Sequence, residues 1–221
     1  MHETSKYSIN RIRYKSFLYY GVTKNLRVMK PKSKTKIREI GEIKIGSLML
    51  AKPFWSNDVK IYSRSTILII DHSYKGTTGI MINKICDVSL IDAIPELNYN
   101  APLYFGGPIN QKVISFIHGN ANVPGAFYLG NSIFWGGHID YILDNNGAFQ
   151  SNLKNFRFYA GLVQWGAGQL EQEMNDEKWW VSETNLNEIM EVAIEDLWGE
   201  KLIEDRNLYG MFYTYPDPSM S

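Results

Sequence analysis

The sequence predicts an α/β (α+β) fold, a compact domain with a mixed β-sheet flanked by helices. Apolar residues make up 44% of the 221 residues and aromatic residues 14%, so the chain can bury a sizeable core. Short strand-like runs are separated by glycine and proline turns. Helical periodicities stand between these runs without strict βαβ alternation, which favours a mixed sheet over a parallel one.

The first strands follow from the apolar pattern that begins near Ile43. The run "IGSLMLA" at 45–51 predicts a strand that Pro53 ends. "STILIID" at 65–71 is continuously apolar and β-branched, which is typical of a strand covered on both faces. After the turn "SYKG", the run "TTGIMINK" at 77–84 is expected to return as the second strand of a hairpin.

The middle of the chain alternates a short helix with further strands. "VSLIDAIPEL" predicts the helix, because Ser89 and Asp92 have the spacing of a capping box. "APLYFGGP" predicts a strand that ends in a turn at Gly106, Gly107 and Pro108. "KVISFIHG" predicts another strand, and "GAFYLGNSIFWGG" predicts two short extended pieces.

The remaining elements are two helices and a strand. "HIDYILDNNG" predicts a helix that stops at Gly147, and "NFRFYAGLV" predicts a further strand. A final helix is expected from about Leu186 to Trp198. Asn185 and Glu188 stand at the N-cap and N3 positions of that helix.

The stretch "QWGAGQLEQEM" predicts a tight turn that leads into an acidic helix. Gly166 and Gly168 allow a bend that side chains would block. A dinucleotide site is disfavoured, because Glu171 stands where the last glycine of G-x-G-x-x-G would be. The pattern therefore favours a structural turn over a phosphate-binding loop.

Six pieces in order resemble the AlgH/YqgE family of bacterial proteins: "GSLMLAKP", "RSTILIIDH", "GTTGIMINK", "LYFGGP", "ISFIH" and "YAGLVQWGAGQLEQE". The resemblance runs from about Gly46 to the C-terminus. It implies a compact mixed α/β domain in the cytoplasm and no established catalytic activity. Family members are often labelled transcriptional regulators, although the residues here contain neither a helix-turn-helix pair nor a zinc finger. One departure is that "YAGLVQWGAGQLE" carries extra residues before Trp165, so the local turn is expected to differ.

The resemblance and the residue types together suggest a binding surface at turns and strand ends. Its candidate residues are Arg64, His72, Asn83, Gly106, Gly107, His118, Trp165, Gly166, Gly168, Gln169 and Glu171. We assign no catalytic residue, no metal and no cofactor. The leading hypothesis is a non-catalytic regulatory or binding protein that acts through a protein partner or a small ligand and influences transcription.

A hydrolase or transferase is the alternative. In that hypothesis His72 is a general base that works with Asp71 or with His118. The competing interpretation is that each histidine is satisfied by backbone groups at a strand end. No two histidines have the close spacing typical of metal ligands.

Two further side chains carry open alternatives. Arg64 is expected to bind an anion or a partner's carboxylate, or else to form a salt bridge within the acidic body. Asn83 is expected to cap a turn. Cys86, the single cysteine, excludes an internal disulfide and fits a reducing, cytoplasmic setting. Lys84 is close enough to activate this thiol, but apolar filler is the favoured interpretation.

Charge is distributed unevenly although the net charge is zero. Residues 1–40 hold 11 of the 23 Lys/Arg and 2 of the 23 Asp/Glu, which leaves an acidic remainder. We expect residues 1–42 to be a basic, flexible arm and 43–221 to be one domain; Met29 is an alternative natural start, which would make 1–28 an upstream extension. Contact with nucleic acid is expected only through the arm. Apolar runs such as "TILII" are too short to span a bilayer, so no membrane contact is expected.

Overall fold

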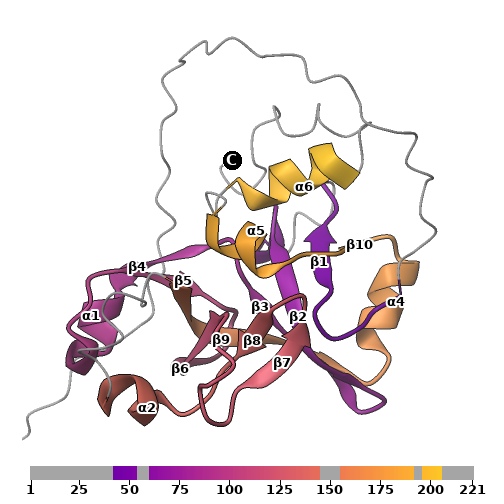
Figure 1. Cartoon of the computed structure of the whole chain (residues 1–221). Helices are drawn as coiled ribbons and strands as arrows, with labels where there is room; N and C mark the ends of the chain where they lie inside the picture. Colours follow the sequence, from indigo (N-terminus) through magenta and orange to yellow (C-terminus); the bar gives the residue numbers. More distant parts are fainter. Residues whose placement is uncertain (1–41, 54–59, 145–154, 192–195, 206–221) are drawn as a thin grey trace, which may run out of the picture.

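The computed structural model describes residues 42–53, 60–144, 155–191 and 196–205 (Figure 1). The strands of this part are β1 Leu48–Ala51, β2 Thr66–Ser73, β3 Gly76–Met81, β4 Ile85–Ser89, β5 Pro102–Phe105, β6 Ile109–His118, β7 Phe127–Gly130, β8 Ile133–Trp135, β9 Phe156–Gly166 and β10 Trp179–Ser182. The helices are α1 Leu90–Ala93, α2 Ile139–Asp144, α4 Gln169–Asn175, α5 Leu186–Glu191 and α6 Leu197–Asp205, with 3-10 turns at Lys60–Tyr62 and Pro95–Leu97.

All of these strands belong to one 10-stranded sheet whose main path is β10-β1-β2-β3-β9-β6-β8-β7. β5 and β4 branch from this path, because β5 pairs in parallel with β9 and β4 pairs with β5. The other pairings between described strands are antiparallel. The expected combination of sheet and helices is therefore present, but the fold is dominated by strands and its helices are short.

β9 is the strand that holds the sheet together. Its N-terminal half lies between β5 and β6, and its C-terminal half pairs with β3. It continues through Trp165 and Gly166, where the sequence predicted a turn, because these residues pair with Thr77 and Gly76. The bend falls at Gly168, whose φ of 72° is in the left-handed region that glycine favours.

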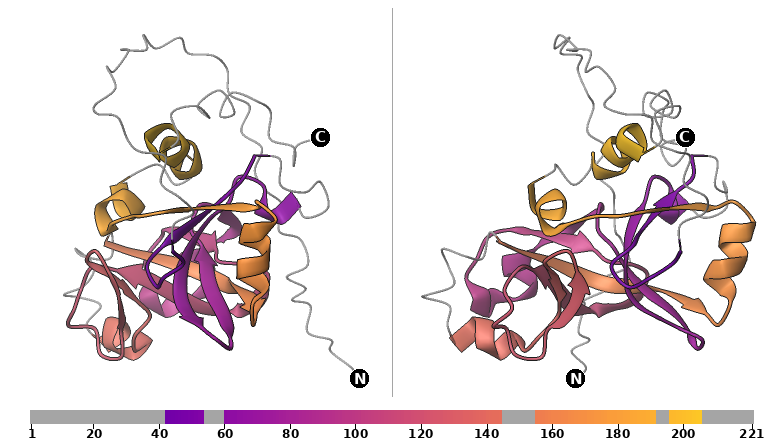
Figure 2. Two further views of the ribbon diagram at one scale, coloured as in Figure 1. Left: turned by 90° about the vertical axis from the view of Figure 1, so that its right-hand side faces the viewer. Right: turned by 45° about the vertical axis from the view of Figure 1, so that its right-hand side comes forward.

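The core lies on both faces of β1, β2 and β3, as the apolar run of β2 predicted. Leu68 and Ile70 face one cluster, which includes residues of α5 and α6. Ile67 and Ile69 face a second cluster, which includes residues of α4. Figures 1 and 2 show α5 and α6 over one side of the sheet and α4 beside its β10 end.

Two predicted helix caps are confirmed. The backbone N–H of Asp92 donates to Ser89 Oγ (3.3 Å) at the start of α1, and that of Glu188 donates to Asn185 Oδ1 (3.1 Å) at the start of α5. The β2–β3 hairpin is also confirmed. These features form between residues that are close in the sequence, so they can be predicted from the sequence alone.

Other expectations need correction. The range from about Leu186 to Trp198, predicted as one helix, instead belongs to two: Leu186–Glu191 is α5, Asp196 is in a turn and α6 starts at Leu197, while 192–195 lie outside the described residues. The sequence did not indicate β10, which follows β9 and pairs with β1. The predicted strand at 45–51 begins only at Leu48. Gly46 precedes it in a turn with a φ of 85° and donates its N–H to the Ile69 carbonyl (2.8 Å).

Some expectations lie outside the described residues. They are the basic arm, of which only residue 42 is described, and the helix stop at Gly147. Within the described part, no helix has both the length and the apolar character needed to cross a membrane.

Candidate functional site

Residues of the "QWGAGQLEQE" stretch and Trp179 of β10 form a closed network of hydrogen bonds, which we call the indole lock (Trp165, Gly166, Gln169, Glu173 and Trp179). The Gly166 N–H donates to Gln169 Oε1 (3.0 Å), and Gln169 Nε2 donates to Glu173 Oε1 (3.2 Å). Both indole N–H groups, from Trp165 (2.9 Å) and Trp179 (2.7 Å), donate to Glu173 Oε2. The lock thereby joins β9, α4 and β10.

Burial explains why the lock needs a carboxylate. Trp165 and Trp179 are only 5% and 2% exposed and pack edge to face at 5.9 Å. An indole N–H only donates, so at this depth each needs an acceptor. Burial, followed by the charge of Glu173, raises the pKa of Tyr62, whose ring packs on Trp179. The predicted site residues Trp165, Gly166 and Gln169 are thus engaged with one another.

His72 and Glu171 lie beside the lock at the surface. His72 Nδ1 is 2.7 Å from Thr77 Oγ1, and its Nε2 is 3.9 Å from Glu171 Oε1. Asp71 adjoins His72 on β2, and adjacent strand residues point to opposite faces of a sheet. The contact is long and both side chains are partly exposed, so it is weak in solvent and lacks the short, enclosed geometry of a proton relay.

His118 is enclosed at the end of β6. Its Nδ1 accepts the Asn120 N–H (3.1 Å), so its Nε2 carries the proton and donates to the Gly136 carbonyl (3.0 Å). The ring stacks on Phe134 and Phe156. Burial lowers the pKa of His118 against the opposing effect of these two hydrogen bonds. The imidazole is therefore a neutral, satisfied core group.

The two histidines do not share a site. His72 pairs with Thr77, which pairs with Trp165 near the C-terminal end of β9. His118 pairs with Phe156 at the other end of the same strand. At about 3.3 Å per residue, roughly 30 Å of strand separates these positions. The geometry therefore does not support a hydrolase in which His72 works with His118.

Arg64 and Asn83 stabilise one turn. Asn83 is buried; its Oδ1 accepts the Thr66 N–H, and its Nδ2 donates to the Arg64 carbonyl, both at 2.7 Å. This holds Arg64 in a left-handed conformation (φ 51°), as a turn-capping amide does. The Arg64 guanidinium lies 5.4 Å from the Trp198 ring centroid, so it packs on α6.

Gly106 and Gly107 allow close backbone contact at the end of β5. The Gly106 N–H donates to the Ala160 carbonyl, and its carbonyl accepts the Met81 N–H, both at 2.8 Å. Gly107 has a φ of 149°, and a Cβ there would overlap the Leu162 carbonyl group. These glycines join β3, β5 and β9, which is a structural role.

Neither a reactive thiol nor a metal site is formed by the described residues. Burial, together with the charge of Asp87, raises the pKa of Cys86 to about 11. The thiol is then protonated at neutral pH and is a poor nucleophile. Among the residues described, no three His, Cys, Asp or Glu side chains come close enough to hold a metal ion.

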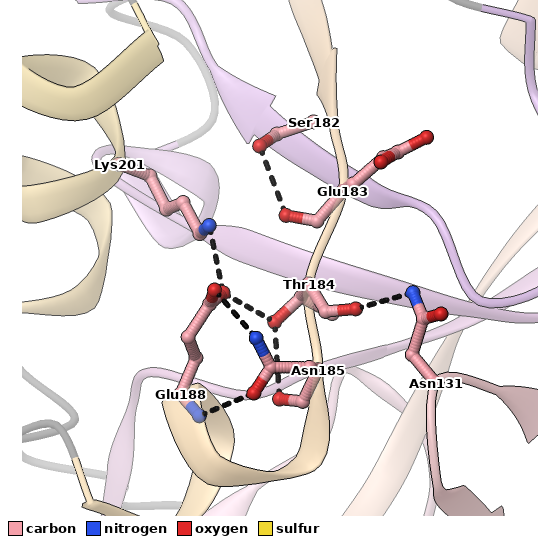
Figure 3. Close-up of polar contacts among 7 residues, drawn as sticks. All are labelled: Asn131, Ser182, Glu183, Thr184, Asn185, Glu188 and Lys201. Carbon is pink, nitrogen blue, oxygen red and sulfur yellow. Dashed lines mark hydrogen bonds and ion pairs between the residues drawn. The ribbon is translucent and has the colours of Figure 1, made fainter. Parts of the chain in front are cut away.

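A second polar network anchors α5 and α6 (Figure 3). Lys201 of α6 is 4% exposed, and its Nζ lies 2.7 Å from Glu188 Oε2 on α5. Thr184 Oγ1 donates to the same carboxylate (3.0 Å), and Asn131 Nδ2 donates to the Thr184 carbonyl (2.7 Å). The network joins both helices to the turn between β7 and β8.

One face of the sheet carries a set of polar side chains that the sequence did not indicate. We call it the donor face, and it consists of Tyr104, Ser115, Trp135, Arg157 and Tyr159. The strand register places Tyr159 beside both Ser115 and Tyr104. It places the buried Ile117 beside Trp135 and Arg157. Directly paired residues point to the same side, so four strands contribute to one surface.

The donor face differs from both networks because its buried atoms are left over. Tyr159 Oη, Ser115 Oγ and Trp135 Nε1 are buried and have no hydrogen-bond partner among the described residues. Tyr159 is 0% exposed, and burial is the largest effect that raises its pKa. A buried polar group left unsatisfied costs about 1–3 kcal/mol, so three on one face require an explanation.

Arg157 gives the donor face a positive charge and a link to α5. Its guanidinium lies 5.4 Å from the Tyr104 ring centroid, and that ring lies 5.5 Å from the ring of Tyr159. Arg157 Nη2 donates to the Met190 carbonyl of α5 (2.8 Å). The only sequence signal was the alternation in "NFRFYAG", which puts Arg157 and Tyr159 on one side of β9.

The sequence profile of the AlgH-like family matches residues 48–206. This chain belongs to the AlgH-like family. The match confirms the resemblance, and it spans the chain from β1 to α6, including the indole lock and the donor face.

The relatives are similar over most of their length. A UPF0301 protein of Bacteroides thetaiotaomicron is 30% identical over 177 residues, which cover 77% of this chain and 87% of the relative. One of Chlorobium limicola is 28% identical over 187 residues, which cover 82% and 97%. The family assignment thus rests on nearly whole-length matches.

Two solved structures share the fold of this chain. A crystal structure of a protein from Corynebacterium diphtheriae matches with a TM-score of 0.65 at 26% identity, over 80% of this chain and 95% of that one. The solution structure of AlgH from Pseudomonas aeruginosa matches with a TM-score of 0.60 at 18% identity, over 85% and 98%. At 18% identity, the similarity to AlgH of Pseudomonas aeruginosa shows a shared fold and nothing more.

Proposed function

We propose that this AlgH-like protein binds a small ligand at the donor face and acts as a non-catalytic binding protein in the cytoplasm. The observation that carries the proposal is the Tyr159 hydroxyl. It is fully buried and has no partner among the described residues. Ser115 and Trp135 add two more such atoms on the same face. A bound ligand would satisfy these groups and remove their energetic cost.

The side chains of the donor face support binding rather than turnover. Burial raises the pKa of Tyr159, so its phenol stays protonated and is not a base near neutral pH. A serine nucleophile requires a base within hydrogen-bond reach, and no side chain of the donor face is a carboxylate or an imidazole. The groups present donate hydrogen bonds, as suits recognition of a ligand.

A route to a partner follows from the position of α5. Arg157 bonds to the Met190 carbonyl, so a ligand that reorients Arg157 would shift the end of α5. α5 is in turn tied to α6 through Glu188 and Lys201. In this proposal a protein partner reads the outer surface of these helices, and any influence on transcription passes through that partner.

The test is recovery of the ligand. Full-length protein, purified without a tag under native conditions, is denatured, and mass spectrometry identifies the small molecules released. We expect one compound, chemically unchanged, in about stoichiometric amount, and its loss from Tyr159→Phe. Tyr128→Phe, an exposed tyrosine on β7, is the matched control and should retain it. Equal recovery from Tyr159→Phe and wild type, or no compound at all, would refute the proposal.

The basic arm motivates a separate proposal, that residues 1–42 contact nucleic acid. Its support is the charge imbalance, with 11 Lys/Arg against 2 Asp/Glu in residues 1–40. Binding through phosphates gives an affinity that falls steeply with salt. Removal of the arm should abolish binding to a DNA duplex. If the truncated protein binds equally well, the arm has no such role.

A further inference from the structure

We infer that the basic arm binds to an acidic side of its own domain, and that nucleic acid has to displace it from there. The acidic side is the surface formed by α4, β10, α5 and α6, which lie within residues 169–205. This inference rests on the proposed contact between the arm and nucleic acid, and it adds the regulation of that contact. Its support is the charge of the two segments, the place where the arm joins the domain, and two ion pairs formed there.

The two segments carry opposite charges of similar size. Residues 1–40 hold 11 Lys/Arg against 2 Asp/Glu, whereas residues 169–205 hold 12 Asp/Glu against 2 Lys/Arg. Of those two lysines, Lys201 is buried against Glu188, and Lys178 pairs with a neighbouring carboxylate. The exposed acidic residues of this side are Glu171, Asp176, Glu177, Glu183, Glu191 and Glu200. A surface of one sign attracts a segment of the opposite sign, so the arm is the matching occupant.

The arm joins the domain at the acidic side. Figures 1 and 2 show α4 beside the β10 end of the sheet, with α5 and α6 over one of its sides. The described chain begins at residue 42, and Ile43 packs against the cluster that contains Met174 of α4 and Trp179 of β10. The arm therefore starts next to the carboxylates that we assign to it, and not across the molecule from them.

The chain that continues from the arm already pairs with this side. Lys44 Nζ lies 3.5 Å from Glu183 Oε1, and Lys52 Nζ lies 3.6 Å from Glu177 Oε2. Each pair is weak by itself, because its side chains are largely in solvent. Several such pairs on one tethered segment act together, since each one raises the effective concentration of the next. The lysines of the arm extend the same pairing.

The lysines nearest the domain are within reach of the acidic side. The run "KPKSKTK" at 30–36 has a lysine at every second position. Seven to thirteen residues separate these lysines from Ile43, so a fully extended chain carries them at most about 25 to 45 Å from it. That distance covers a domain of ordinary size, about 30 Å across. The run follows Met29, so the inference holds for either start of the chain.

An arm held in this way is not available to phosphates. The apparent affinity for nucleic acid falls by the fraction of molecules in which the arm is free, so docking in nine molecules out of ten weakens it about tenfold. A DNA duplex competes as a second polyanion, and salt screens both contacts. The acidic side thus sets how much nucleic acid is needed to engage the arm.

The first test maps the contact directly in the full-length protein. A carbodiimide joins lysines to carboxylates that touch, and mass spectrometry identifies the joined peptides. In about 50 mM salt we expect lysines of 30–36 to be joined to the acidic side, and at least fivefold less so in about 500 mM salt. Lys52 and Glu177 are the internal positive control. A mixture of light and heavy isotope-labelled protein shows whether the contact forms within one molecule.

Three outcomes of this map would overturn the inference. One is that lysines of 30–36 join no carboxylate although the control pair is joined. Another is that they join only between molecules. The last is that they join equally often to exposed carboxylates of the α1 and α2 region, which Figures 1 and 2 show at the end of the molecule away from α4. Those carboxylates are Glu96, Asp140 and Asp144.

The second test measures the consequence for DNA binding. The triple variant Glu177→Gln, Glu191→Gln and Glu200→Gln removes three charges from the acidic side. We expect it to bind a DNA duplex about tenfold more tightly than wild type in about 50 mM salt. The matched control removes three charges at the other end of the molecule, by Glu96→Gln, Asp140→Asn and Asp144→Asn, and should stay within about twofold of wild type. Equal gains in the two triple variants would overturn the inference.

The two tests together separate this inference from the proposed role of the arm. If the map shows the contact but neither wild type nor the first triple variant binds DNA, the arm binds the acidic side and the nucleic-acid role is wrong. If the arm is needed for DNA binding but the map shows no contact and the triple variants bind equally, the nucleic-acid role stands and the inference fails.

Discussion

Replacement of Glu173 by alanine tests whether the family motif is structural. One carboxylate oxygen of Glu173 accepts both indole N–H groups, from Trp165 and Trp179, and the other oxygen accepts from Gln169. Alanine removes all three bonds and leaves two buried donors unsatisfied. Gln169 is at the surface, where water replaces its lost acceptor.

The expected loss follows from the two buried donors. Each orphaned N–H costs about 1–3 kcal/mol, so Glu173→Ala should lower the free energy of unfolding by about 4 kcal/mol. For a domain of 150–250 residues, 1 kcal/mol corresponds to roughly 2–4 °C of melting temperature, which predicts a fall of about 8–16 °C. Glu173→Gln should lose about 1–2 kcal/mol, because its amide keeps one acceptor but turns a second donor toward Gln169.

Glu171→Ala is the matched control on the same helix. Its carboxylate makes only a 3.9 Å contact with His72 and is 49% exposed, so we expect a change within about 0.5 kcal/mol. Both variants gain the same helix propensity from alanine, and that term cancels in the comparison. Thermal and urea unfolding followed by circular dichroism give the values. A loss in Glu173→Ala no larger than in Glu171→Ala would refute the structural role of the lock.

Three further predictions concern single positions. Gly107→Ala should cost about 3 kcal/mol in urea unfolding, because its φ of 149° and the Leu162 carbonyl exclude a Cβ; a wild-type midpoint would contradict this. At pH 7.5 the pKa of about 11 leaves Cys86 roughly 300-fold fewer thiolates than a cysteine of pKa about 8.5, so iodoacetamide should label it slowly until denaturant is added. Burial lowers the pKa of His118 in the folded state, so its stabilisation is complete above the unfolded value of about 6.5 and is lost as pH falls from there through the folded pKa. Unfolding between pH 7.5 and 5.5 should show this slope in wild type and His72→Gln and a smaller one in His118→Phe.

Local features of this fold could be predicted because adjacent residues determine them. Ser89 and Asn185 cap their helices through the residue three positions ahead, and the β2–β3 hairpin joins strands that are neighbours in sequence. Asn83 was expected to cap a turn, and it does so for Arg64. The family resemblance was also carried by short runs that stay intact in the fold.

The errors came from tertiary pairing. Gly166 has the composition of a turn, yet it lies in a strand because Gly76 on β3 pairs with it. β10 is short and at the edge of the sheet, and no alternation marks it. The indole N–H groups of Trp179 on β10 and Trp165 on β9 both donate to Glu173. One carboxylate on α4 thus accepts hydrogen bonds from two strands. No local pattern expresses such a partnership.

The donor face was beyond prediction for the same reason. Its residues come from β5, β6, β8 and β9, and which of them share a surface depends on register. β6 contains an irregularity between Ile109 and Ile114, and a shift of one residue there would turn Ser115 to the opposite side. Register also decides which residues are far apart. The sequence allowed His118 to lie near His72, but the register places them at opposite ends of β9.

The contrast between the indole lock and the donor face indicates where the functional constraint lies. In the lock every buried donor has an acceptor, and such a closed network stabilises a fold without any ligand. At the donor face, three unsatisfied atoms cost about 1–3 kcal/mol each, a sum comparable with much of the 5–15 kcal/mol by which a domain is stable. Phenylalanine at Tyr159 and alanine at Ser115 would relieve part of that cost with little change of shape. Residues that lower the free energy of unfolding and are still present are explained by function rather than by stability, and ligand recognition is such a function. The indole lock is therefore part of the scaffold, and the ligand should be sought on the face where hydrogen bonds are missing.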